Sequence, residues 1–337
     1  SWSSATATSR RTGTSDPAPP AVRAMKRALI TGIGGQDGAY LAELLLGKGY
    51  EVHGTSRDAQ AARFAGLAKL GIREQVKTLS MAPCDLRSVI AALETVQPQE
   101  IYNLSGQSSV GLSFEQPVAT MESVLGATMN LLEAMRSLGG GMRLFNAGSG
   151  ECFGETGAVP ANEATPFRPH SPYAVAKSAA HWLVSNYRDA YGLFACTGIL
   201  FNHESPLRPE RFVTQKIVQV AKRIAAGSKE KLELGNTRVV RDWGWAPEYV
   251  EAMYLMLQQE RADDYVVATG ESVSLEDFIR FTFEHLGLDW KAHVVANQSL
   301  LRPLDIVESR ADPAKAARVL GWTARTRVRE VAARLAD

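Results

Sequence analysis

The sequence predicts an α/β protein built on a doubly wound parallel sheet, with a smaller, mostly helical lobe at its C-terminal end. Short apolar runs alternate with segments of helical periodicity from Arg27 to Phe201, and a glycine-rich turn follows the first apolar run. Repeated strand–helix units with apolar strands form parallel sheets that helices cover on both faces. After Phe201 this alternation ends, and prolines and glycines separate shorter elements.

The expected strands are short and apolar, with residues 28–31 as the first. The others in the main unit cover residues 51–54, 77–80, 100–103, 143–146 and 195–201, and a later strand at 265–268 is expected to return to the sheet. Between them, apolar residues at helical spacing predict helices at 40–46, 62–70, 88–96, 118–138 and 173–191. In the second lobe, helices are expected at 212–226, 248–258, 312–320 and 328–335.

Residues 1–24 are rich in Ser, Thr, Ala, Pro and Arg and contain almost no bulky apolar residues. Such a segment buries too little surface to offset the entropy of ordering it, so we expect a flexible tail. A targeting role is the alternative, although the segment lacks the apolar centre of a signal peptide. We expect residues 25–201 to form the main domain, with a later return near 239–270, and residues 202–337 to form the smaller lobe.

The composition excludes some partners. With 37 basic and 36 acidic side chains, the chain has no overall field that would attract nucleic acid or an anionic membrane. No apolar run approaches the ~20 residues that a membrane-spanning helix needs. Cys84, Cys152 and Cys196 cannot all pair and lack metal-ligand spacing, which indicates a reducing, cytoplasmic setting and no metal site.

A glycine-rich turn follows the first strand and opens the first helix. Gly32, Gly35 and Gly38 have the spacing TGxxGxxG, a variant of the dinucleotide fingerprint. Glycines there allow the tight turn and the close approach of backbone N–H groups to a pyrophosphate, and the helix N-terminus adds partial positive charge. We expect this turn, including Gln36 and Asp37, to bind a dinucleotide; a glycine turn without a ligand is the alternative.

The end of the second strand indicates which dinucleotide is bound. An acid there grips the ribose hydroxyls of NAD, whereas an arginine accommodates the 2′-phosphate of NADP. Because Arg57 precedes Asp58, we expect NADP rather than NAD. The alternative is a surface Arg57–Asp58 pair without a ligand.

Two later strand ends complete the expected cofactor path. Asp85 and Leu86 follow the third strand and are suitably placed to touch an adenine edge. After the fourth strand, small residues leave room for the central part of the cofactor: Leu104, Ser105, Gly106, Gln107 and Ser108. Position is the only support for these assignments, and plain loops are the alternative.

Four side chains form the candidate catalytic set. Ser149 and Glu151 follow the fifth strand, and Tyr173 and Lys177 lie four residues apart on the next helix, where side chains share a face. We expect the ammonium to lower the pKa of the phenol from about 10 towards neutrality. Such a phenol accepts a proton from a sugar hydroxyl as hydride leaves the same carbon. For Glu151, a solvated loop acid is the alternative.

Together these motifs resemble the extended short-chain dehydrogenase/reductases. Three further motifs closely resemble the GDP-mannose 4,6-dehydratase family, and the resemblance runs from about residue 27 to the C-terminus: Asn202-His203-Glu204-Ser205-Pro206, Arg241-Asp242-Trp243-Gly244 and Arg302-Pro303. It implies a Rossmann domain with NADP, a nucleotide-sugar substrate, a hydro-lyase activity without net cofactor use, and a homodimer or homotetramer.

The resemblance also implies a role for each matching residue. Ser149 takes the place of a catalytic threonine, Glu151 of the carboxylate that removes the C5 proton, and Tyr173 with Lys177 of the base and its partner. Two residues fall at NADP contacts: His203 and Arg208. Four fall where the nucleotide-sugar is held, and they are Asn202, Lys216, Arg241 and Arg302. For the three cations among them, solvated surface side chains are the alternative.

The sequence also departs from the family pattern. The family has Thr-Ser-Glu at the strand end where this chain has Ser149-Gly150-Glu151, and it has paired arginines where only Arg57 stands. Two alternatives therefore stay open. One is an NADP-dependent reductase or epimerase acting on a related nucleotide-sugar, and the other is a dinucleotide-binding regulator that has lost catalysis.

Overall fold

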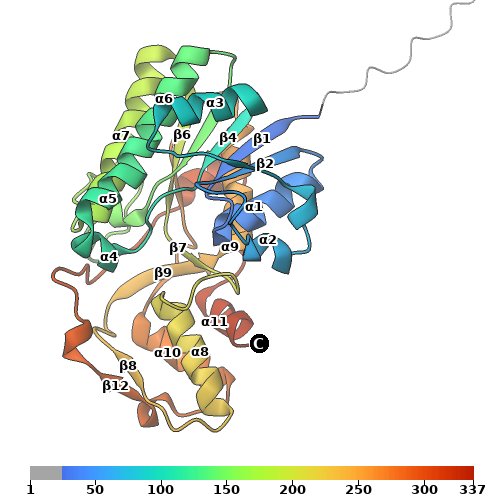
Figure 1. The fold of residues 1–337 in the computed structure, drawn as a ribbon. Helices are drawn as coiled ribbons and strands as arrows, with labels where there is room; N and C mark the ends of the chain where they lie inside the picture. Colours follow the sequence, from blue (N-terminus) through green and yellow to red (C-terminus); the bar gives the residue numbers. More distant parts are fainter. Residues whose placement is uncertain (1–24) are drawn as a thin grey trace, which may run out of the picture.

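The apolar runs form one parallel sheet of seven strands, in the order β10-β6-β5-β4-β1-β2-β3 (Figure 1). The structure is a computed structural model and describes residues 25–337, so the tail expected at 1–24 lies outside the described residues. The strands are β1 (Arg27–Thr31), β2 (Glu51–Ser56), β3 (Lys77–Ser80), β4 (Glu100–Asn103), β5 (Arg143–Ala147), β6 (Phe194–Leu200) and β10 (Tyr265–Val267). The predicted doubly wound fold is confirmed, and β10 pairs in parallel with β6.

Strand register sorts alternate side chains onto the two faces of the sheet, because successive residues of a strand point in opposite directions. One row packs into one core and contains Leu29, Ile101, Leu144 and Ala195. The neighbouring row packs into the opposite core and contains Ile30, Tyr102, Phe145 and Cys196. Both faces are therefore apolar, which explains why the strands read as continuous hydrophobic runs.

Helices cover both faces. The core on one face includes side chains of α1 (Gln36–Gly47), α2 (Ala65–Lys69) and α9 (Ala246–Leu257). The other core includes side chains of α3 (Leu86–Val96), α6 (Ala127–Leu138) and α7 (Pro172–Tyr191). Before α6 come α4 (Val110–Glu115), α5 (Pro117–Met121) and η2 (Glu122–Gly126); the last two continue into α6, so the helix expected at 118–138 is present.

The second lobe has its own core, around α8 (Val213–Ala225), α10 (Leu275–His285) and α11 (Val328–Ala336). A three-stranded sheet, β11 (Ser272–Ser274)-β9 (Val240–Trp245)-β7 (Asn202–Glu204), lies between these helices and the main sheet (Figure 1). A two-stranded sheet joins β12 (Val294–Ala296) to β8 (Leu232–Leu234). Helix α10 was not predicted from the sequence. The capping box at its start, formed by Ser274 and Asp277, is a sequence pattern that indicates a helix N-terminus.

Short helical turns complete the fold: η1 (Arg73–Gln75), η3 (Gly150–Phe153), η4 (Trp290–Ala292), η5 (Gln298–Leu300) and η6 (Ala316–Leu320). The last of these lies in the C-terminal part of the helix expected at 312–320. None of the helices in the described part of the chain is both long and apolar enough to span a bilayer. The sheet order reverses between β1 and β4, and the carboxyl ends of strands at such a reversal form a crevice for ligands.

Candidate active site

A cleft of about 410 Å³ lies at this edge of the sheet. Its walls come from the carboxyl ends of β4, β5 and β6, from the start of α7, and from β7, β9 and residues 300–305 of the second lobe. Because the two halves of the wall come from the main sheet and the second lobe, a ligand in the cleft would touch both. Among residues 25–337, no group of three or more His, Cys, Asp or Glu side chains is arranged to hold a metal ion.

Most of the predicted site residues line this cleft. They are Asp37, Leu104, Ser105, Gly106, Ser108, Ser149, Glu151, Tyr173, Lys177, Asn202, His203, Arg208, Lys216, Arg241 and Arg302. The others do not belong to its wall, and they are Gly32, Gly35, Gln36, Gly38, Arg57, Asp85, Leu86 and Gln107. The structure thus brings the candidate catalytic and substrate residues into one cavity, while most of the glycine-rich turn lies beside it.

The glycine-rich turn has no room for side chains at two positions. Gly32 has a φ of +75°, and a Cβ there would lie 2.7 Å from the Leu104 carbonyl oxygen. A Cβ on Gly38 would lie 2.6 Å from the Gly32 carbonyl oxygen. The turn therefore packs backbone against backbone, and α1 begins directly after it without a side-chain cap. Its first N–H groups are oriented for an anion, as in the dinucleotide fingerprint.

Asp37 and His203 tie this turn to β7. The His203 ring lies 3.0 Å from the Asp37 carboxylate through Nε2 and 2.7 Å from the Phe201 carbonyl through Nδ1. Burial lowers the pKa of His203, but the charge and hydrogen bond of Asp37 outweigh it and raise that pKa above its usual value. Burial raises the pKa of Asp37, but the charge and hydrogen bond of His203 outweigh it and lower that pKa to about 2. Gln36 reinforces the tie by donating to the His203 carbonyl at 3.1 Å.

Several predicted cofactor residues also have partners within the protein. Asp85 caps α3 by accepting a hydrogen bond from the Arg87 N–H at 2.9 Å. Gln107 donates to the Ser109 carbonyl at 2.8 Å and so braces its own loop. Leu86 is exposed at the start of α3, and Arg57 is exposed directly after β2. Their roles at a cofactor stay predictions.

The candidate catalytic residues are positioned by two helix starts. Ser149 caps η3, because its Oγ accepts from the Glu151 N–H at 3.3 Å. Ser171 caps α7, and this places Tyr173 and Lys177 one turn apart at the helix start. The Lys177 Nζ donates to the Ala147 carbonyl at 2.7 Å and lies 5.8 Å from the centroid of the Tyr173 ring.

The prediction that the Tyr173 pKa is lowered is wrong when only the protein's own groups act on the phenol. Burial raises the pKa of Tyr173, and the hydrogen bond from Ser149 only partly opposes this rise. Burial also destabilises the charged form of Lys177 and lowers its pKa to about 8. The physical reason is desolvation: both groups are buried, and the ammonium donates to a carbonyl rather than to the phenol.

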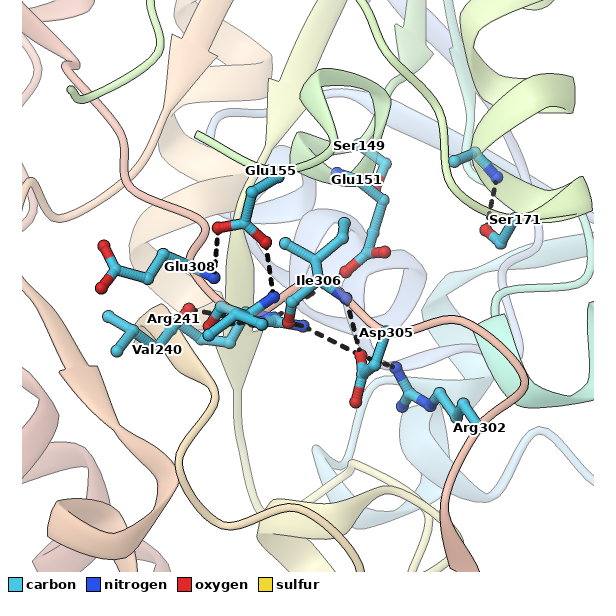
Figure 2. A network of polar contacts seen from close by, with 12 residues as sticks. Ser149, Glu151, Glu155, Ser171, Val240, Arg241, Arg302, Asp305, Ile306 and Glu308 are labelled. Carbon is cyan, nitrogen blue, oxygen red and sulfur yellow. Dashed lines mark hydrogen bonds and ion pairs between the residues drawn. The ribbon is translucent and has the colours of Figure 1, made fainter. Parts of the chain in front are cut away.

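Glu151 lines the same cleft as this pair and lies next to a cluster of charges from the second lobe (Figure 2). Burial raises its pKa, while the charges of Arg241 and Arg302 oppose the rise. The Arg241 Nε lies 3.9 Å from the Glu151 carboxylate, and the Arg241 Nη2 lies 3.3 Å from Asp305. Arg302 contacts the same Asp305 carboxylate at 3.4 Å. Glu151 is therefore a partly buried acid held near cations in the wall of the cleft.

The second lobe adds further cations to the cleft. Lys216 donates to the Glu233 carbonyl at 2.7 Å, and the Arg208 guanidinium lies 3.8 Å from the centroid of the Phe212 ring. Arg211, which the sequence analysis missed, also lines the cleft and lies 5.0 Å from the same centroid. The readable signal was two arginines close to one aromatic residue.

Comparison with known proteins identifies the family. The family model described as GDP-mannose 4,6 dehydratase matches residues 29–335. The chain belongs to this family. GDP-mannose 4,6 dehydratase 2 of Arabidopsis thaliana is 49% identical over 311 residues, which cover 89% of this chain and 83% of that protein. GDP-mannose 4,6-dehydratase of Vibrio cholerae is 40% identical over 344 residues, which cover 92% of each. The resemblance expected from the motifs is confirmed.

Solved structures place this family member among related folds. A UDP-glucose 4-epimerase of Thermus thermophilus, in complex with NAD, has a TM-score of 0.80 and 28% identity, with 92% of this chain and 98% of that chain covered. A UDP-glucose 4-epimerase of Thermotoga maritima has a TM-score of 0.82 at 20% identity, with 92% and 97% covered. The latter likeness shows the fold alone.

Proposed function

We propose that this protein is a nucleotide-sugar 4,6-dehydratase that converts GDP-mannose to GDP-4-keto-6-deoxymannose without net cofactor use. The observation that carries this proposal is a partly buried carboxylate, Glu151, in the same cleft as Ser149, Tyr173 and Lys177. A reductase or epimerase with the same Tyr–Lys pair needs no carboxylate at this point. The substrate follows from the relatives, whose names specify GDP-mannose.

The protein's own residues fit a nicotinamide dinucleotide. A side chain at Gly32 or Gly38 would collide with the backbone, so both positions require glycine. Without side chains there, the backbone of the turn can approach a pyrophosphate, and α1 begins at the same place. We favour NADP over NAD because of the second strand end. The Asp58 carboxylate accepts from two N–H groups of its own loop at 3.0 Å, so Arg57 is the better placed group to meet a 2′-phosphate.

In the first step, Tyr173 accepts the proton of the sugar's 4-hydroxyl, with Ser149 as a hydrogen-bond partner of that hydroxyl. A nicotinamide dinucleotide bound beside these residues would supply the hydride acceptor for C4 and the hydride donor for C6, and its positive charge when oxidised would favour the phenolate form of Tyr173. Lys177 adds a positive charge beneath the tyrosine, although its pKa of about 8 limits this contribution to neutral and lower pH.

In the second step, the new C4 ketone acidifies the C5–H bond. The Glu151 carboxylate removes that proton and returns it to the C6 hydroxyl, which leaves as water. The proton that C5 regains balances the one that Tyr173 removed, so the reaction releases water and no net proton. A carboxyl whose pKa is raised by burial suits both halves of this exchange, because it is a stronger base and remains able to donate.

For the nucleotide-sugar, the proposal keeps Asn202, Lys216, Arg241 and Arg302 as binding residues, since all four line the cleft. Arginine forks and lysine suit the oxygens of a diphosphate. The proposal also includes a cytoplasmic location and a homodimer or homotetramer, as the sequence analysis predicts.

Mass spectrometry of products from a panel of GDP-sugars tests the function. We expect GDP-mannose to lose one water without added NADPH. Product formation that consumes NADPH stoichiometrically would instead identify a reductase, and stable cofactor binding with no product from any nucleotide-sugar would identify a regulator. Either result would contradict the proposal.

A further inference from the structure

The Arg241 side chain is buried, and its donors are already engaged by the protein. The guanidinium donates to the Ile306 carbonyl at 2.8 Å and the Val240 carbonyl at 3.0 Å, and it contacts Asp305 at 3.3 Å. A guanidinium has five N–H groups in a fixed fork. Most of these N–H groups therefore have protein acceptors. The remaining donor is Nε, which lies 3.9 Å from the Glu151 carboxylate in the cleft.

Apart from the Val240 carbonyl, the hydrogen-bond partners of Arg241 lie on one short segment, residues 305–308, which we call the strap. Backbone hydrogen bonds hold its C-terminal half: Val240 N–H to Val307 carbonyl at 2.7 Å and Thr156 N–H to Glu308 carbonyl at 3.0 Å. A side chain also holds the strap. The Glu155 carboxylate accepts from the Val307 N–H at 2.7 Å and the Glu308 N–H at 2.8 Å (Figure 2).

We propose that Glu155 is a positioning residue for the Arg241–Glu151 pair. Its carboxylate holds the strap, the strap's Asp305 and Ile306 hold the guanidinium, and the guanidinium sets the ionisation of the carboxyl that serves as the C5 base. Arg241 then acts as a fixed positive charge beside Glu151 in the wall of the cleft. This inference rests on the proposed role of Glu151.

Several charged or titratable groups face Glu151, and each contributes to its ionisation. The second lobe contributes Arg241 on β9, Arg302 just before the strap and Asp305 on the strap. The main domain contributes His170 on the segment before α7, Tyr173 on α7 and Cys152 on η3, next to Glu151. Among them, Arg241 is the largest influence that opposes burial. A guanidinium that moves away therefore stabilises the carboxylate less, and the Glu151 pKa rises.

The chain offers a test variant and a matched control. Glu155→Gln keeps one carbonyl acceptor for the strap and loses the second, while the backbone bonds still hold the strap's other half. The control is Glu308→Gln, because the Glu308 carboxylate pairs with Arg310 at 3.0 Å and points away from Arg241 (Figure 2). Both changes remove one negative charge from the same region.

The experiment titrates the Glu151 carboxyl by ¹³C NMR in the native protein and both variants, with Glu151→Gln to assign the resonance. In parallel, kcat and KM for GDP-mannose are measured against pH. In Glu155→Gln we expect the Glu151 pKa to rise by at least about half a unit, a shift that one charge contact of this strength readily produces. In the plot of kcat against pH, the acid limb of Glu155→Gln should move by the same amount, and its kcat should recover at higher pH. In Glu308→Gln, the pKa of Glu151 should equal that in the native protein.

Two outcomes would overturn the inference. One is a Glu151 titration that Glu155→Gln leaves unchanged, and the other is a rise in KM alone, which would assign the strap to substrate binding. If Glu155→Gln fails to fold, Glu155→Asp replaces it, since the shortened arm should release one N–H and shift the titration in the same direction. A native protein that forms no dehydrated product would defeat the proposed function, whereas the NMR titration would still test the positioning role.

Discussion

Replacing Lys177 by methionine should stabilise the folded protein at neutral pH and destabilise it at alkaline pH. The ammonium is buried, and burial lowers its pKa from 10.5 to about 8. At 1.36 kcal/mol per pKa unit, this drop corresponds to about 3 kcal/mol that the folded state loses by keeping the lysine charged. Methionine is similar in length and carries no charge, so it removes this cost.

The sign follows from proton binding. Below pH 8 the lysine is charged in both states, and the folded state bears the full cost. Between pH 8 and 10.5 the folded state releases the proton while the unfolded state keeps it, so the stability of the native protein rises with pH. The native protein should therefore gain about 2.5 kcal/mol relative to the variant between pH 7 and pH 10. The lost hydrogen bond to the Ala147 carbonyl costs the variant about 1–3 kcal/mol at every pH.

Urea unfolding of the native protein and Lys177→Met at pH 7, 8, 9 and 10 measures this difference. We expect the variant to be about 1 kcal/mol more stable at pH 7 and less stable at pH 10. The same substitution at the exposed Lys69 controls for the general loss of a positive charge. A stability difference that stays constant across the four pH values would refute the burial argument.

Three other changes test the site. Glu151→Gln should lower the rate of water loss by about 10²–10⁴-fold while C4 oxidation is retained, as seen in the product mass and in nicotinamide absorbance, and dehydration at the native rate would contradict the assigned role. Tyr173→Phe should suppress the first hydride transfer by a similar factor, so normal reduction of bound cofactor would count against it. Gly38→Ala places a Cβ 2.6 Å from the Gly32 carbonyl oxygen and should destabilise the turn by about 1–3 kcal/mol and release cofactor on gel filtration. Gly47→Ala on the same helix meets nothing within 4 Å and should leave cofactor retention unchanged.

The main domain was readable from local pattern. Residues 77–80 and 100–103 form strands with the predicted bounds, and the helix expected at 173–191 begins one residue earlier, at Pro172. The central strands of a sheet that is buried on both faces are continuous apolar runs, so the sequence indicates their positions. Elements of the second lobe are shorter and pair across long distances in the chain. For example, β9 pairs with both β7 and β11, and none of the three was predicted as a strand.

Site residues could be predicted from the sequence where residues of a given type, at a given spacing, form a known chemical motif. Tyr173 and Lys177 share a helix face, and Gly32 and Gly38 stand where a Cβ would collide with the backbone of the turn. The ionisation of these groups was not readable, because it depends on how much water surrounds them. Tyr173 shows this, since helical spacing predicts a lowered pKa and burial raises it.

The fold class, the family and the identity of the candidate catalytic groups follow from the order of the amino acids alone. These depend on periodicity and on motifs whose parts lie within about one helical turn of each other. Which charges come to lie beside one another depends instead on the folded chain. Glu155 and the strap are about 150 positions apart, as Glu155 and Val307 differ by 152. Coulomb forces and hydrogen bonds act through space, so contacts of this kind become visible only once the chain has folded.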